Sequence, residues 1–150
     1  MKRFAFDLES VLLLRKYREQ EAEIALGKEV GDLNRIEKNI ADVAEEKKRS
    51  AAERFSLGYS VSEMRVFDLY TQRLDWVKEK LLEDAARAEL KVEAARKVYL
   101  EAEREREVLD KVKEGELQEH RKQGFTEEAE VLDDVSNEAF IRNLTEQNLA

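Results

Sequence analysis

The sequence predicts an all-α protein: a long two-helix antiparallel coiled-coil hairpin with a short, bent or frayed C-terminal helix. Charged residues make up 41% of the 150 residues and proline is absent, a composition typical of long solvated helices. Apolar residues recur every three or four positions along two long segments, which is the pattern of a coiled-coil seam. The stretch RFSLGYSVSEM separates these segments and carries the turn signals.

Residues 1–150 are therefore expected to form a single coiled-coil domain. The first helix should cover about 7–55, the turn about 56–60, the second helix about 61–123 and the last helix about 127–145. Asp7 is the expected N-cap of the first helix, with Phe6 packing on Val11 as a hydrophobic staple. Gly27 and Gly31 lie on one face and either permit close approach or a bend, or are tolerated weak points. The expected seam of this helix contains Leu8, Val11 or Leu12, Arg15, Ala22, Leu26, Glu29, Leu33, Ile36, Ile40 and Val43.

The second helix should begin with a capping box formed by Ser60 and Glu63. Gly115 and Gly124 are expected to weaken its end, and Thr126 to cap the short last helix. A run of alanines in its seam predicts close approach of the two helices. The expected seam contains Tyr70, Leu74, Val77, Leu81, Ala85, Ala88, Val92, Ala95, Tyr99, Ala102, Arg106 and Leu109.

The net charge of −8 argues against a nucleic-acid partner, because phosphate binding needs a basic face. The charge is uneven. Residues 1–18 have a net charge of +3, and residues 126–150, with seven acids against Arg142, have −6, so the two ends would attract each other if the chain folds back.

No apolar run approaches the ~18–20 residues that span a bilayer, so no membrane insertion is expected. The opening apolar run covers only Val11 to Leu14, and Asp7 and Glu9 fall where the core of a secretory signal should lie, so no such signal is expected.

Enzymatic chemistry is not expected from this sequence. Cysteine is absent, and the only histidine, His120, lies in a charged run typical of solvent-exposed helix. Neither a phosphate-binding loop nor a calcium loop is present, so we predict no catalytic residue, no metal and no cofactor. Trp76 lies off the seam and either faces solvent or a partner, or packs across the hairpin flank. The tip aromatics and Leu57 either close the end of the coil or form a docking patch; they are Phe55, Leu57, Tyr59 and Phe67.

The chain resembles the FliJ family, small coiled-coil proteins of the flagellar type III export apparatus. The opening stretch FAFDLESVLLLRKYREQEAEIAL is similar to the family's opening pattern through Phe4, Phe6, Leu8, Val11, Leu12, Leu14, Arg15, Glu19, Ala22 and Leu26. A glycine-bearing turn followed by FDLYTQRLDWV is a second similarity. The third is an acidic tail motif at Leu132, Asp133 and Asp134, in which Asp134 replaces the family's glutamate.

This resemblance implies a non-enzymatic stalk and adaptor that binds the hexameric export ATPase and promotes its ring assembly. It also implies a link to the cytoplasmic domain of the export gate protein FlhA, contacts with export chaperones, and a place in the cytoplasm at the inner face of the membrane. On that analogy the ATPase-binding residues are Phe4, Phe6, Leu8, Val11, Leu12, Leu13, Arg15, Leu132, Asp133 and Asp134. The gate-binding residues are Ile40, Val43, Lys47, Tyr70, Leu74, Val77 and Leu81.

One conflict follows from these assignments. The periodicity places the stripe of Tyr70, Leu74, Val77 and Leu81 inside the hairpin seam, whereas the resemblance places it on the outer surface. Either the stripe is seam, or the seam near the tip uses Val66, Leu69, Arg73 and Trp76 instead. Three alternative functions also stay open: a passive coiled-coil scaffold, a stalk of a virulence-type secretion system, and a chaperone for export substrates.

Overall fold

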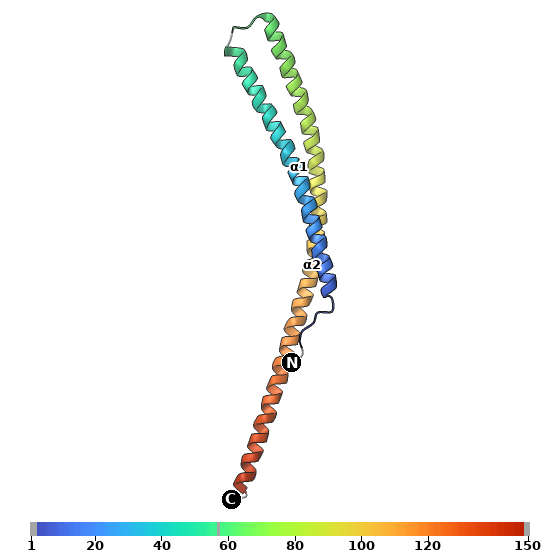
Figure 1. Ribbon diagram of the computed structural model, residues 1–150, viewed down its shortest axis with the longest axis vertical. Helices are drawn as coiled ribbons and strands as arrows, with labels where there is room; N and C mark the ends of the chain where they lie inside the picture. The colour runs from blue at the N-terminus through green and yellow to red at the C-terminus, as the bar shows by residue number, and fades with distance from the viewer. Residues whose placement is uncertain (1–2, 57, 149–150) are drawn as a thin grey trace. The chain divides into compact units, whose positions relative to one another are not determined.

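The computed structural model describes residues 3–56 and 58–148, and these form two long α-helices without a strand. Helix α1 spans Glu9–Ser56 and helix α2 spans Val61–Asn148. Side chains are described for residues 3–54 and 58–142. Figure 1 shows α1 and α2 as two helices joined by one turn. The predicted all-α helical hairpin is confirmed.

The chain divides into two compact units. Residues 17–103 form one unit, which we call the hairpin unit. Residues 1–16 and 104–150 form the other, which we call the terminal unit. Both helices pass through both units, so each unit contains part of α1 and part of α2.

In the hairpin unit, α1 and α2 pack as antiparallel partners (Figure 1). Near the turn, Arg54 of α1 forms an ion pair with Asp68 of α2 at 2.9 Å, and two helical turns farther along Lys47 pairs with Asp75. These pairs fix the register at the tip half, although exposed pairs of this kind contribute little to stability. The buried apolar residues follow the predicted spacing, so the predicted seam is confirmed; they are Ala22, Leu74, Ala85, Ala88 and Val92.

The turn is followed by the predicted capping box, which is confirmed. The Ser60 backbone N–H donates to the Glu63 carboxylate at 2.7 Å, and the Glu63 N–H donates to the Ser60 hydroxyl at 3.4 Å. These hydrogen bonds from the Ser60 backbone and hydroxyl lower the pKa of Glu63 below its ordinary value. Two otherwise unpaired groups at the start of α2 are thereby satisfied.

The start of α1 differs slightly from the prediction. The Leu12 N–H donates to the Leu8 carbonyl at 2.9 Å, so Leu8 is the N-cap and the helix begins at Glu9. Asp7 lies one residue earlier, in a turn closed by the Glu9 N–H donating to the Phe6 carbonyl at 3.2 Å. The prediction of Asp7 as N-cap is therefore wrong by one residue.

Helix α2 does not end near Gly124. It continues through Thr126 to Asn148, so the separate helix expected at about 127–145 is the last part of α2. The Thr126 hydroxyl donates to the Lys122 carbonyl at 3.1 Å, as a threonine inside a helix does, and does not cap a new one. A glycine costs a helix about 1 kcal/mol but leaves the backbone N–H in place, unlike proline, so helix can continue through it.

The paired glycines of α1 do not mark a close contact. A Cβ atom added at Gly27 or Gly31 would meet no neighbouring heavy atom within 4 Å. The structure therefore does not support the interpretation of close approach, while a bend and tolerated weak points in a long helix both stay open. No described helix has a stretch apolar enough to cross a membrane.

Candidate protein-binding surfaces

In the terminal unit, residues 3–16 lie along the part of α2 that follows residue 104. The Phe4 ring contacts His120 edge to face with centroids 5.6 Å apart, and the ammonium of Lys113 lies 5.8 Å from the centre of the Phe6 ring. Lys113 also forms an ion pair with Glu9. His120 is therefore half-buried by an aromatic contact and is not the fully solvated residue that the sequence predicted.

The predicted ATPase-binding residues of the N-terminal segment fall into three groups by exposure: buried, half-buried and outward-facing. Phe6 and Leu12 are buried in the terminal unit, and Leu12 is only 1% exposed, so these side chains stabilise the fold. Phe4 and Arg15 are half-buried, and Arg15 pairs with Glu105 of α2. The outward group consists of Leu8, Val11 and Leu13, and the structure adds Leu14 to it.

The last part of α2 presents a second exposed surface. Residues 125–142 are exposed at every position, and Figure 1 shows no other described segment of the terminal unit beside them. The predicted site residues Leu132, Asp133 and Asp134 lie here, with Leu132 66% exposed. An open groove lined by Gly124, Glu127, Glu128, Val131 and Leu132 begins this surface. The site prediction omitted the other large exposed apolar residues, which are Phe125, Val131, Val135, Phe140 and Ile141.

For Phe125 and Val135, spacing was the signal that could have identified them. Phe125, Ala129, Leu132, Val135 and Ala139 are three or four residues apart, which places them on one face of a helix. We call these five residues the tail stripe. The N-terminal segment does not cover the stripe, because its contacts with α2 are made at Glu105, Lys113 and His120. The N-terminal segment therefore lies beside residues 105–120. Arg15, one of the basic residues expected to attract the acidic tail, pairs with Glu105 instead of with an acid of the tail.

The predicted gate-binding residues all line the seam of the hairpin unit. Leu74 is buried, while Ile40, Val43, Val77 and Leu81 are half-buried. Lys47 and Tyr70 lie at the seam edges, where Lys47 pairs with Asp75 and the Tyr70 hydroxyl donates to Glu46 at 2.9 Å.

The conflict over the seam is thereby resolved. Leu74 is 8% exposed and Trp76 is 60% exposed, so Leu74, Val77 and Leu81 pack inside the hairpin, with Tyr70 at the seam edge. The alternative seam is wrong, because Val66, Leu69, Arg73 and Trp76 all face outward. Trp76 is accordingly an exposed residue and does not pack across the flank.

The tip aromatics are partly described. The Tyr59 and Phe67 rings contact each other with centroids 5.0 Å apart, and both side chains are half-buried. The Phe55 side chain and Leu57 lie outside the described residues.

A family comparison bears on these surfaces. The sequence model of the flagellar FliJ protein family matches residues 4–145, which is nearly the whole chain. The chain belongs to the FliJ family. No curated protein and no solved structure matches it. Membership makes this FliJ-family chain a component of the flagellar export apparatus.

The surfaces of this FliJ-family chain carry side chains suited to protein contacts. Within the described residues, no group of three or more His, Cys, Asp or Glu side chains is arranged to hold a metal ion. The exposed apolar residues are instead spread along helix faces bordered by charge, which is typical of helix–helix docking surfaces.

Proposed function

We propose that this chain is a non-enzymatic stalk and adaptor of flagellar export that binds the hexameric export ATPase and promotes its assembly. The observation that carries the proposal is the exposed apolar surface of the terminal unit, in a chain of the FliJ family. Apolar stripes that a helix leaves uncovered stabilise a complex when a partner removes them from water.

The ATPase-binding surface in this proposal has two parts. The first is the outward face of the N-terminal segment, formed by Leu8, Val11, Leu13 and Leu14. The second is the tail stripe together with the exposed acids Asp133 and Asp134 on other faces of the same part of α2. Phe6 and Leu12 act indirectly, since their burial holds the N-terminal segment on α2.

The test is ATP turnover and ring formation by the cognate ATPase with the purified chain added. We expect both to rise, and we expect removal of residues 1–14 to weaken the effect while most helicity remains. A triple change of Phe125, Leu132 and Val135 to serine should also weaken it. The matched control changes three exposed apolar residues outside the proposed surface to serine: Leu90, Val98 and Val108. No rise in turnover or assembly at a several-fold molar excess of the wild-type chain would contradict the proposal.

The second part of the proposal is a contact between the tip half of the hairpin unit and the cytoplasmic domain of the gate protein FlhA. Because Leu74, Val77 and Leu81 pack in the seam, the accessible members of the predicted set are Tyr70 and Lys47 at its edges. The seam residues would then act by holding α1 and α2 in register.

A pair of alanine substitutions tests the gate contact. Tyr70→Ala should weaken binding of the FlhA cytoplasmic domain about tenfold, the size expected for an aromatic contact residue. Trp76→Ala is the control, since Trp76 is an exposed aromatic six residues away on another face. Weaker binding by the Trp76 variant with unchanged binding by the Tyr70 variant would place the gate contact elsewhere.

A further inference from the structure

An exposed stripe that the proposed function does not use lies on α2 in the hairpin unit. It consists of Val66, Leu69, Arg73, Trp76 and Lys80, spaced alternately by three and four residues, so all five lie on one helix face. Every member is exposed. We call it the tip stripe. It has the spacing of a coiled-coil seam but packs against no described helix.

The tip stripe is positively charged. Arg73 and its neighbour Arg65 form no ion pair with the described residues, and Lys80 pairs only with Glu83 of the next turn, at 3.1 Å. The acids of this region point away, because Asp68 and Asp75 pair with Arg54 and Lys47 of α1. The apolar side chains of the stripe therefore lie beside Arg65 and Arg73, two cations unpaired within the described residues, whereas Lys80 at its end is paired with Glu83.

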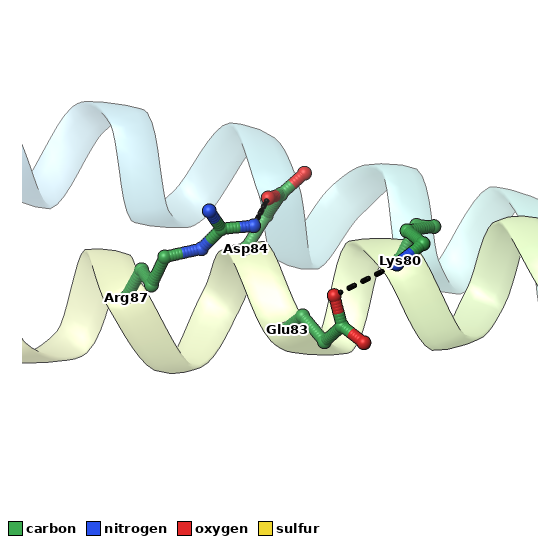
Figure 2. A network of polar contacts seen from close by, with 4 residues as sticks. All are labelled: Lys80, Glu83, Asp84 and Arg87. Carbon is green, nitrogen blue, oxygen red and sulfur yellow. Dashed lines mark hydrogen bonds and ion pairs between the residues drawn. The ribbon is translucent and has the colours of Figure 1, made fainter.

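The same face of α2 changes character beyond Lys80. Figure 2 shows Lys80 directed to Glu83 and Arg87 directed to Asp84, so the face there consists of ion pairs that neutralise each other. Exposed pairs of this kind offer little net charge or apolar area to a partner. The cationic apolar patch thus covers residues 65–76 and ends at this network, to which Lys80 belongs.

The tail stripe is bordered by acids and is therefore complementary in charge to the tip stripe, which is bordered by cations. Its apolar residues are bordered by Glu128 and Asp133, and residues 125–142 contain six acids against Arg142. The two stripes have the same 3–4 spacing, and each spans fifteen residues, at 66–80 and at 125–139. Two helices with matched stripes can pack side by side over that length.

We propose that the tail stripe of one copy binds the tip stripe of a second copy. Apolar residues of both stripes would be removed from water, and the acids beside the tail stripe would face Arg65 and Arg73. The contact joins two different surfaces, because tail against tail would place acids together and tip against tip would place cations together. It is therefore a heterologous contact between copies.

The contact should be weak and salt-sensitive. One helix face on another buries less area than a stable dimer interface requires, and exposed charges are screened at high ionic strength. The tail stripe is also the second part of the proposed ATPase-binding surface, so a second copy and the ATPase would compete for it. That competition rests on the proposed function, whereas the contact between copies does not.

Trp76 is the only tryptophan and reports directly on the tip stripe. In the experiment, the wild-type chain at low concentration is titrated with a Trp76→Phe chain. The added chain keeps its tail stripe as the ligand but emits no tryptophan fluorescence. We expect a saturable blue shift of Trp76 emission at about 0.05 M salt, reduced at least several-fold in affinity at about 0.5 M. Arg73→Glu in the fluorescent chain should weaken the affinity about tenfold, and Glu128→Lys with Asp133→Lys in the added chain should restore part of it.

Matched titrants identify the tail as the ligand. In the Trp76→Phe chain, changing Phe125, Leu132 and Val135 to serine should abolish the shift, whereas changing Leu90, Val98 and Val108 to serine should leave it intact. Circular dichroism checks that each variant keeps its helicity. No shift up to hundreds of micromolar titrant, or an equal shift with the tail variant, would overturn the proposal. A shift that arises only with vesicles containing phosphatidylglycerol would also overturn it and would make the tip stripe a lipid-binding surface.

Discussion

The hairpin unit and the tail of the terminal unit are built from similar residues but differ in what covers them. In the hairpin unit, the 3–4 stripe of α2 packs against α1 and buries Leu74, Ala88 and Val92. In the tail, an equally regular stripe packs against no described segment and leaves Leu132 exposed. The difference teaches that a coiled-coil stripe indicates a partner but does not say whether the same chain supplies it.

Amide hydrogen exchange should give the largest difference between the two regions. Amides of the hairpin seam, such as those around Leu74 and Val92, should exchange only through opening of the packed helices. Amides at 127–140 should exchange faster by orders of magnitude, because their helix is held by its own hydrogen bonds alone and a lone helix of this length is marginal in water. Equal protection in the isolated monomer would contradict the comparison. Adding the ATPase should slow exchange in the tail.

Truncation of a leucine should give the next largest effect. Leu74→Ala removes a buried side chain and should lower the free energy of unfolding by about 3 kcal/mol. Leu132→Ala, the same change at an exposed site, should change it by less than about 0.5 kcal/mol. Chemical denaturation measures both. A comparable loss in the tail variant would indicate that the monomer covers Leu132.

Glycine replacement in α1 should raise stability. No atom stands within 4 Å of a Cβ at Gly27 or Gly31, so alanine fits at both, and each change should add about 1 kcal/mol to the free energy of unfolding. Thermal melting of the double variant measures the sum. A lower melting temperature would contradict the finding that these positions are free of close contacts. If the stabilised variant also stimulates the ATPase normally, the glycines are not a functional bend.

The capping box should give the smallest effect, a change in the acid stability of the hairpin. Because hydrogen bonds from Ser60 lower the pKa of Glu63, the folded state favours the ionised carboxylate. This contribution is fully present above the ordinary pKa of glutamate and is lost as the pH falls through the lowered pKa. The melting temperature of Glu63→Gln should therefore depend less on pH in that acidic range than that of the wild type. Parallel curves for the two proteins would show that Glu63 does not contribute in this way.

Much of the fold was predictable because the signals are local. The capping box needs only Ser60 and Glu63 three residues apart, and the seam of each helix follows from the spacing of its apolar residues. The break near Gly124 was mispredicted, because continuation of a helix depends on cooperative neighbours and a single glycine costs only about 1 kcal/mol. The N-cap was misplaced by one residue for a similar reason, since helix ends depend on small energy differences.

The candidate sites were less predictable than the fold. The opening motif mixes residues that pack inside the terminal unit, such as Phe6 and Leu12, with residues that face outward, such as Leu13. A sequence pattern cannot separate these two groups, because both are apolar and lie close together. The contact between Phe4 and His120 also joins residues far apart in the chain, and no local signal indicates it.

By itself, the sequence determined that this chain forms long helices, where its turn lies, and that each helix carries apolar stripes, because composition, capping and periodicity act within a few residues. Only the tertiary structure decided which stripe of α2 is the seam. Leu74 and Trp76 belong to two stripes of the same spacing on one helix, and packing against α1 buried the first and left the second exposed. The physical reason is that one helix face can be covered by α1 only once, so the other stripes remain available to other molecules.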